Sequence, residues 1–255
     1  MTEQHNTLAG RVAVVTGATG GIGAATARRL AAGGASVALI GRREERLKEL
    51  AAEMGEIGGK AVAVAADVSD LEAMTRAAET VRTALGPVDL VVANAGTMLG
   101  APYESAQPVE WDRMIGTNLS GLIYTGRVFV DDLLATAAEG RSADLVHVGS
   151  IASHTFYPTY AVYAATKAAV ATLTRSLRVE LGPRNVRVKN VEPGMTATEL
   201  GGDMLDDGAR EQFAEVRKTV QALEPGDIAD AIAYACAAPT RLNLAHLIAL
   251  PSWQG

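Results

Sequence analysis

Hydrophobic residues follow two alternating patterns along this chain. Short runs rich in Val, Ile, Leu and Ala are typical of buried strands, whereas longer segments with apolar residues at every third or fourth position are typical of helices. The short runs predict strands at 11–16, 36–40, 61–65, 88–92, 144–149, 186–191 and 246–250. The longer segments predict helices at 22–33, 43–54, 70–85, 108–135, 160–181, 208–218 and 226–237.

The alternation of strands and helices predicts an α/β fold with right-handed crossovers. We expect a Rossmann-type, doubly wound parallel sheet of about seven strands with helices on both faces. Because no repeat, low-complexity tract or linker divides the sequence, residues 1–255 are expected to form a single domain. The segment 137–143 is expected to be an exposed loop that enters the fifth strand.

A glycine-rich turn follows the first predicted strand. Gly17, Gly21 and Gly23 form a G-x-x-x-G-x-G pattern just before an Ala- and Arg-rich helical segment. A strand, a glycine turn and a helix N-terminus together let backbone N–H groups approach a pyrophosphate. The spacing differs from the G-x-G-x-x-G dinucleotide fingerprint, and glycine turns are often only turns, so this pattern alone does not decide the function.

Candidate acid–base chemistry lies in the run Tyr163-Ala-Ala-Thr-Lys167, with Ser150 thirteen residues before Tyr163. On a helix, a four-residue spacing places Tyr163 and Lys167 on one face. A nearby ammonium group lowers the pKa of a tyrosine, which suits proton transfer to or from an alcohol oxygen. A serine hydroxyl can donate a hydrogen bond to the same oxygen. In isolation, the motif is more often a half-buried aromatic ring beside a solvated lysine.

In this order, the motifs resemble the short-chain dehydrogenase/reductase family over essentially the whole sequence. The resemblance implies a dinucleotide-binding and catalytic domain whose cofactor turn is the glycine pattern. It further implies that Asp67-Val68 flanks adenine and that Pro193-Gly194 lies beside the nicotinamide, whose amide would bond Thr196 or Thr198. The implied cofactor contacts are Gly17, Thr19, Gly21, Ile22, Gly23, Asp67, Val68, Asn94, Ala95, Gly96, Tyr163, Lys167, Pro193, Gly194, Thr196 and Thr198.

The same resemblance implies a catalytic tetrad of Asn118, Ser150, Tyr163 and Lys167. Tyr163 would be the general acid/base for hydride transfer between a nicotinamide and a carbon that bears oxygen, with Lys167 holding the nicotinamide ribose. From the residues alone, Asn118 could equally be a polar residue that kinks a helix. In the family it does both, and it holds a water that links the lysine to solvent.

The end of the second predicted strand bears on the choice of dinucleotide. Gly41 stands where an NAD enzyme would offer a carboxylate to the ribose hydroxyls, and Arg42 follows directly. A guanidinium there can pair with a 2′-phosphate, and no carboxylate repels that phosphate. NADP(H) is therefore favoured over NAD(H). The alternative is that Arg42 and Arg43 simply begin a solvated, charged helix, as in an NAD-linked enzyme that works oxidatively.

The substrate is less defined by the sequence. Met98, His154, Tyr157 and Met195 are candidate contacts to a moderately hydrophobic carbonyl compound, although a lone surface histidine is the commoner role for His154. By resemblance, the segment 195–218 is a substrate lid. The chain is most similar to the branch with 3-hydroxy acid (serine-type) dehydrogenases and clavulanic-acid-type aldehyde reductases, which spans polar and apolar substrates.

Charge and composition narrow the possible partners. A net charge of −6 argues against nucleic acid and anionic membranes, which favour basic patches. The start of the chain lacks the features of a signal peptide, and no apolar run is long enough to cross a membrane, so a cytoplasmic location is expected. The single cysteine, Cys236, is expected to be a buried helical residue, and no metal site is assigned.

Two further expectations rest on the family resemblance. The long helices at 108–135 and 160–181 are expected to pair between subunits and give a homodimer or homotetramer. A protein on the same fold can also be a catalytically silent dinucleotide sensor. Such proteins usually lack the tyrosine or lysine of the tetrad, and this chain retains both.

Overall fold

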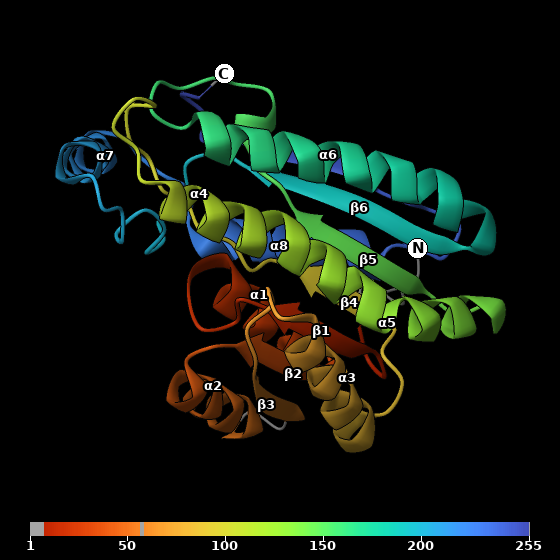
Figure 1. Ribbon diagram of the computed structural model, residues 1–255. Helices are drawn as coiled ribbons and strands as arrows, with labels where there is room; N and C mark the ends of the chain where they lie inside the picture. Colours follow the sequence, from red (N-terminus) through yellow and green to blue (C-terminus); the bar gives the residue numbers. More distant parts are fainter. Residues whose placement is uncertain (1–7, 57–58, 255) are drawn as a thin grey trace.

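The computed structural model describes residues 8–56 and 59–254. Within them, seven strands form a single sheet: β1 (Val12–Thr16), β2 (Ser36–Gly41), β3 (Ala61–Ala65), β4 (Leu90–Ala93), β5 (Ala143–Val148), β6 (Val186–Pro193) and β7 (His246–Ala249). Their order across the sheet is β3-β2-β1-β4-β5-β6-β7, and every neighbouring pair is parallel (Figure 1).

Helices cover both faces of the sheet (Figure 1). One face packs against α1 (Gly21–Ala32), α2 (Glu44–Glu56) and α8 (Pro225–Ala237). The other packs against α3 (Leu71–Leu85), α5 (Gly121–Ala138) and α6 (Ala161–Leu181). This arrangement confirms the predicted doubly wound α/β fold.

The strands are buried because helices lie on both sides of them. Val14 faces one apolar core and Val15 faces the other, and neither side chain is exposed to solvent. Such two-sided burial explains why the strands appear in the sequence as continuous apolar runs.

All the predicted helices and strands form, with one internal difference. The segment predicted as a helix at 108–135 consists of α4 (Pro108–Met114), a π-helical turn at Ile115–Ser120, and α5. Helix α5 continues to Ala138 and β5 begins at Ala143, so the predicted exposed loop at 137–143 is wrong at both ends. Ala137 is buried against the sheet, and this apolar contact extends the helix beyond the predicted end.

The order of the strands creates a crevice beside β1. From β1 the chain builds outward through β2 to β3, and it then crosses back to place β4 on the other side of β1. In open α/β sheets, ligands bind at the carboxyl ends of the strands where the order reverses in this way. Helix α7 (Asp207–Thr219) lies near this end of the molecule (Figure 1).

A buried ionic cluster joins several strands away from this crevice. The Asp144 carboxylate on β5 is fully buried and lies 2.7 Å from the Lys189 ammonium, 2.7 Å from the Arg187 guanidinium and 2.9 Å from that of Arg11. Burial alone would raise the pKa of Asp144, but these three cations hold it below its usual value. The carboxylate is therefore a charged junction between β5, β6 and the residue that precedes β1.

Two expectations about the chain concern membranes and thiol chemistry. Among the described residues, no helix is long and apolar enough to span a membrane. The N-terminal residues used to argue against a signal peptide lie outside the described residues. Cys236 is buried in α8, as predicted, and burial raises the pKa of its thiol to about 12.

We predict that Asp144→Ala lowers the free energy of unfolding by about 3–5 kcal/mol, because it leaves buried cations without their partner. Urea denaturation measures this loss. The control is Asp230→Ala, which removes an exposed partner of Arg29 and should cost less than about 1 kcal/mol. Equal losses for the two variants would show that the buried cluster is not a stabilising junction.

Candidate active site

A cavity of about 980 Å³ opens at the carboxyl end of the sheet. Its walls include the glycine turn after β1, the segments after β4 and β5, one face of α6, and parts of the segment between β6 and α8. Among the residues predicted to bind cofactor or substrate or to act in catalysis, those that line it are Gly17, Thr19, Gly21, Ile22, Arg42, Asp67, Val68, Asn94, Ala95, Gly96, Met98, Ser150, Tyr157, Tyr163, Lys167, Pro193, Gly194, Met195, Thr196 and Thr198. Gly23, Asn118 and His154 do not line it.

The glycine turn has a conformation that side chains would prevent. Gly17 and Gly21 have φ values of +66° and +53°, in the left-handed region that favours glycine. A Cβ atom on Gly17 would lie 2.8 Å from the Cα atom of Ala95, and one on Gly23 would lie 2.2 Å from the Gly17 carbonyl oxygen. Gly23 therefore acts beneath the turn, where it allows α1 to pack closely.

The N-terminus of α1 faces this turn without a side-chain cap. Its N-cap residue is Gly20, and the first turn contains no acidic residue. Free backbone N–H groups and the positive end of the helix dipole together favour an anion such as a pyrophosphate.

Thr16 and Asn94 join β1 to β4 at the crevice. The Thr16 hydroxyl accepts hydrogen bonds from the N–H groups of Asn94 and Ala95, at 3.1 and 3.2 Å. The Asn94 amide donates to the Thr16 carbonyl oxygen at 3.0 Å. Thr16 begins the motif that resembles the family's cofactor turn, but this bond to the segment after β4 was not predicted from the sequence.

Two arginines follow β2 and have different surroundings. Arg43 donates to the Thr19 hydroxyl at 2.9 and 3.0 Å and pairs with Glu199 at 3.2 Å, so it fastens α2 to the glycine turn. Arg42 lines the cavity and makes no hydrogen bond with any described residue. The Arg42 guanidinium is therefore available to a ligand. The structural role of Arg43 was not predicted from the sequence.

Asp67 lies at the end of the cavity that Arg42 lines. Its carboxylate accepts hydrogen bonds from the Ser69 N–H at 2.9 Å and from the Ser69 hydroxyl at 2.7 Å. Burial alone would raise its pKa, but these hydrogen bonds and the nearby charge of Arg42 hold the pKa below its usual value. The N-cap of α3 is Asp70, whose carboxylate accepts a hydrogen bond from the Ala73 N–H.

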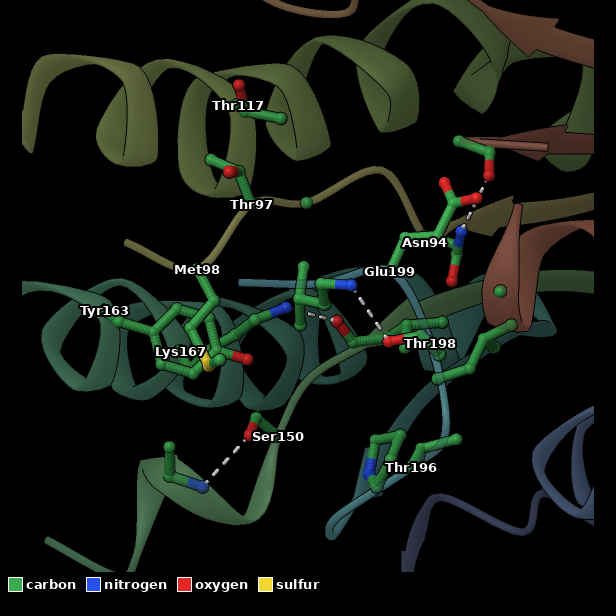
Figure 2. Close-up of a pocket in the computed structure, with 18 of the residues that line it drawn as sticks. Asn94, Thr97, Met98, Thr117, Ser150, Tyr163, Lys167, Thr196, Thr198 and Glu199 are labelled. Carbon is green, nitrogen blue, oxygen red and sulfur yellow. Dashed lines mark hydrogen bonds between the residues drawn. The ribbon is translucent and has the colours of Figure 1, made fainter. Parts of the chain in front are cut away.

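Ser150, Tyr163 and Lys167 meet at the other end of the cavity. Tyr163 and Lys167 project from α6, and Ser150 follows β5 (Figure 2). All three side chains are buried. The Lys167 ammonium donates to the Val148 carbonyl oxygen at 2.9 Å and lies 5.9 Å from the centre of the Tyr163 ring.

The electrostatics of this group differ from the sequence-based expectation. Burial raises the pKa of Tyr163 above its usual value, and the Ser150 hydroxyl opposes this effect only in part. Burial also lowers the pKa of Lys167 to about 8, although the charge of Glu192 acts in the opposite direction. Burial thus outweighs the lowering of the Tyr163 pKa that the sequence predicts.

Asn118 lies in the π-helical turn, behind the wall of the cavity. Its amide oxygen accepts from the Thr97 N–H at 2.8 Å, and its amide nitrogen donates to the Thr97 carbonyl at 2.9 Å and to the Thr166 hydroxyl at 3.1 Å. Asn118 thus ties the segment after β4 to α6, which carries Tyr163 and Lys167. The π turn distorts the helix at this residue, in accord with the first sequence-based role, and the catalytic role stays a prediction.

The candidate substrate residues separate into two groups. Met98, Tyr157 and Met195 line the cavity, together with Tyr160 and Phe213. The prediction that His154 contacts the substrate is corrected, because His154 does not line the cavity. Its Nε2 atom instead lies 2.8 Å from Oε2 of Glu192.

The C-terminal segment contributes contacts that were not predicted. The Gln254 side chain accepts from the Met195 N–H at 2.9 Å and donates to the Tyr157 hydroxyl at 3.1 Å. Arg113 also lines the cavity and is paired with Asp203. Nothing local in the sequence indicates these contacts, because they depend on the fold.

Comparison with known proteins adds to this geometry. A family model described as short chain dehydrogenase matches residues 11–208. Sulfoacetaldehyde reductase 2 from Chromohalobacter salexigens is 36% identical to this chain, with 95% of each protein covered. Glycine betaine reductase ATRR from Emericella nidulans is 35% identical over 96% of this chain, but the chain spans only 19% of that larger protein. A solved structure described as the closed form of serine dehydrogenase complexed with NADP+ is 31% identical, with 96% of each chain covered and a TM-score of 0.87.

We predict that Gly17→Ala destabilises the protein more than Gly10→Ala. Both glycines have positive φ, but a Cβ atom at Gly17 meets the Ala95 backbone, whereas one at Gly10 meets nothing within 4 Å. The shared strain costs about 1–2 kcal/mol, so the clash should appear as an additional loss for Gly17→Ala. Thermal unfolding of the two variants measures the difference, and equal midpoints would contradict the close approach of the turn to Ala95.

Proposed function

Because the chain belongs to the short-chain dehydrogenase family, we propose that it is an NADP-dependent oxidoreductase that interconverts a carbonyl and an alcohol by hydride transfer. The observation that carries this proposal is that a single cavity joins the glycine turn to Ser150, Tyr163 and Lys167. Fold similarity alone would not support an activity, but these side chains supply the chemistry.

The residues at the glycine turn fit a dinucleotide. Gly17 lets the turn pass close to the Ala95 backbone, and the uncapped N-terminus of α1 suits a pyrophosphate. Asp67 and Val68 would flank the adenine, and Pro193-Gly194 would lie beside the nicotinamide, whose amide would bond Thr196 or Thr198. When bound, the cofactor supplies the hydride chemistry, and the protein supplies orientation and electrostatics.

The buried tetrad would move the proton that accompanies the hydride. Ser150 would donate a hydrogen bond to the substrate oxygen, and the Tyr163 hydroxyl would donate its proton to that oxygen during reduction. Lys167 would stabilise the phenolate that remains, because a nearby positive charge is strongly felt where water is excluded. Asn118 would keep Thr97 and α6 in place during this step.

Arg42 supports the choice of NADP(H). It lines the cavity without a hydrogen-bond partner among the described residues, and Gly41 offers no carboxylate that would repel a 2′-phosphate. The serine dehydrogenase structure with NADP+ is consistent with this assignment. The alternative is an NAD-linked dehydrogenase that works oxidatively, for which the nearby Asp67 would have to replace the missing carboxylate.

The substrate is proposed to be a small carbonyl compound or alcohol. Met98, Tyr157 and Met195 give its end of the cavity an apolar character. We propose that 195–218 is a lid, because Leu200 and Phe213 from this segment pack with Met98 and Tyr163 in one apolar cluster. Membership of the 3-hydroxy acid and clavulanic-acid-type branch stays a prediction.

The expected homodimer or homotetramer also stays a prediction. Helices α5 and α6 carry apolar side chains that are exposed in the single chain, including Ile123 and Val179. A second copy packed on these helices would bury such residues. The other alternative, a silent dinucleotide sensor, is disfavoured because all four tetrad residues are present.

We predict that Tyr163→Phe lowers kcat for NADPH-dependent carbonyl reduction by about 10²- to 10⁴-fold, because it removes the proton donor. NADPH oxidation against a panel of aldehydes, ketones, 3-oxo acids and quinones measures this loss. NADPH binding, followed by fluorescence, should change little. Tyr160→Phe, which alters a neighbouring cavity hydroxyl, should retain most of the activity. Retained turnover in Tyr163→Phe would remove Tyr163 from the acid–base role.

We predict that Arg42→Ala weakens NADPH binding by about 10- to 100-fold and leaves NADH binding nearly unchanged, because only NADPH has a phosphate for the guanidinium. Titration with each dinucleotide measures the two affinities. The control is Arg76→Ala, an exposed arginine of α3 that lies outside the cavity. Equal losses for NADPH and NADH in Arg42→Ala would contradict the phosphate role.

A further inference from the structure

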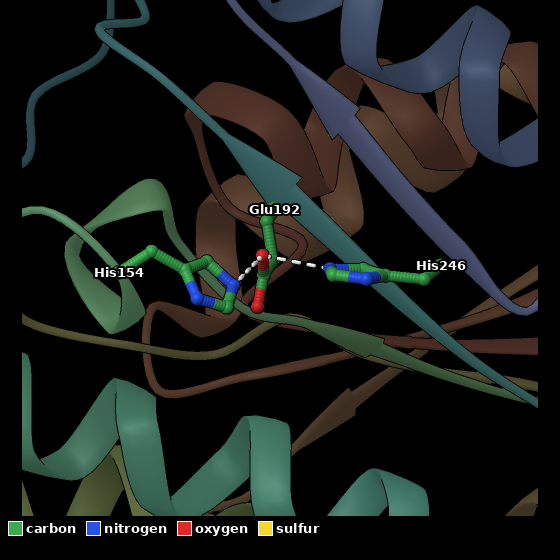
Figure 3. Close-up of side chains that lie close together, drawn as sticks. All are labelled: His154, Glu192 and His246. Atoms are coloured by element: carbon green, nitrogen blue, oxygen red, sulfur yellow. Dashed lines mark hydrogen bonds and ion pairs between the residues drawn. The ribbon is translucent and has the colours of Figure 1, made fainter.

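Three side chains that can bind metal ions meet outside the cavity. His154 follows the short helix at Ile151–Ser153, Glu192 lies near the end of β6, and His246 begins β7 (Figure 3). The Nε2 atom of each histidine lies 2.8 Å from the same carboxylate oxygen, Oε2 of Glu192. The three potential ligand atoms all lie within 4.8 Å of one another.

We propose that His154, Glu192 and His246 form a binding site for a divalent transition-metal ion, with zinc as the probe. Two imidazole nitrogens and one carboxylate oxygen are a donor set that zinc accepts in proteins. Imidazole also suits copper, nickel and iron, whereas magnesium and calcium prefer an all-oxygen set. The sequence did not indicate this site, because the three residues lie far apart along the chain.

The carboxylate is held in position from its other side. Glu192 is fully buried, and its Oε1 atom accepts hydrogen bonds from the Ser153 hydroxyl at 2.8 Å and the Asn190 amide at 2.7 Å. These contacts leave Oε2 directed at the two histidines. Hydrogen bonds that fix the orientation of a ligand in this way strengthen metal binding.

The histidines leave the site accessible. Each side chain is 42% exposed, and the two ring centres lie 5.9 Å apart. An ion can therefore enter from solvent, and water can complete a tetrahedral shell in which the protein supplies three ligands.

Metal binding requires a change of tautomer rather than a large movement. In the structure the two Nε2 atoms serve as hydrogen-bond donors to the carboxylate, whereas a metal needs a lone pair on each of them. For a neutral ring, the proton would move to Nδ1, for which no hydrogen bond is recorded among the described residues. The metal would then replace two hydrogen bonds with three coordinate bonds, one from each Nε2 atom and one from Glu192 Oε2, and Glu192 would keep a partner.

The proposed metal site contacts the segment that carries Ser150 and adjoins the Pro193-Gly194 turn. The Ser153 hydroxyl shares its single proton between Glu192 and the carbonyl oxygen of Ser150, and Glu192 is followed by the Pro193-Gly194 turn. A Cβ atom added at Gly149 would lie 3.0 Å from Glu192 Cγ, so the carboxylate also packs against the residue before Ser150. A bound metal would thus join the segments after β5 and β6 to the first residue of β7.

Zinc titration of the untagged, chelator-treated protein by isothermal calorimetry tests the proposal. We expect one zinc ion per chain, with the affinity reduced by at least about 10-fold in His154→Gln and in His246→Gln. Glutamine keeps an amide that can donate to Glu192, which protects the fold. The control is His5→Gln, the histidine outside the described residues, and it should bind zinc as the unchanged protein does. Unchanged affinity in both His154→Gln and His246→Gln would overturn the proposal.

A second readout does not depend on the variants. Cobalt bound by two imidazoles and a carboxylate in a tetrahedral site gives visible absorption bands, and zinc should displace them from the unchanged protein. Zinc should also raise the thermal unfolding midpoint, because a ligand that binds only the folded state stabilises it. If neither the cobalt bands nor the rise in the unfolding midpoint is seen, His154, Glu192 and His246 bind no metal and only bond one another. Neither readout requires the protein to be an oxidoreductase, so this proposal can fail separately from the proposed function.

Discussion

The site depends first on how β1 and β4 are held together where the strand order reverses. These neighbours in the sheet are distant in sequence, and the loops that leave them must diverge to open a crevice. The Thr16 hydroxyl and the Asn94 amide limit this divergence by bonding each other's backbone. Because Gly17 then passes against Ala95 without a side chain, the turn and the segment after β4 form one continuous wall. This wall sets the position of Gly96. It also sets the position of helix α6, because Asn118 bonds both Thr97 and Thr166.

Buried charge is used differently away from this crevice and within it. The charge of Asp144 is compensated by three cations, one of which, Arg11, also pairs with Asp89. In the cavity, Lys167 donates to a single carbonyl oxygen among the described residues, and burial raises the pKa of Tyr163. Groups that lack a fixed counter-ion respond strongly to a ligand that brings charge, whereas the Asp144 cluster does not. Buried charge is thus paired within the protein at the Asp144 cluster, whereas in the cavity it is left to respond to a bound ligand.

The sequence predicted the order and type of the helices and strands because apolar periodicity depends mainly on local burial. It also predicted which segments line the cavity, because loops at the carboxyl ends of parallel strands converge whatever their composition. It did not predict the π turn at Ile115–Ser120, where periodicity continues through a change in helix geometry. It offered His154 as a candidate substrate contact beside the commoner role of a surface histidine, because spacing from Ser150 does not reveal which side of the strand a ring will face. The contacts of Gln254 were likewise missed, since they join residues from opposite parts of the chain.

The burial of Cys236 has a practical consequence. It is the only cysteine in the chain, and its thiol lies inside α8 with a pKa of about 12, so little reactive thiolate forms near neutral pH. A cysteine introduced on the outer surface of α7, such as Glu211→Cys, would therefore carry a maleimide dye or a spin label without background labelling. The native thiol would not have to be removed first. Any movement of the proposed lid around α7 could then be followed directly in solution.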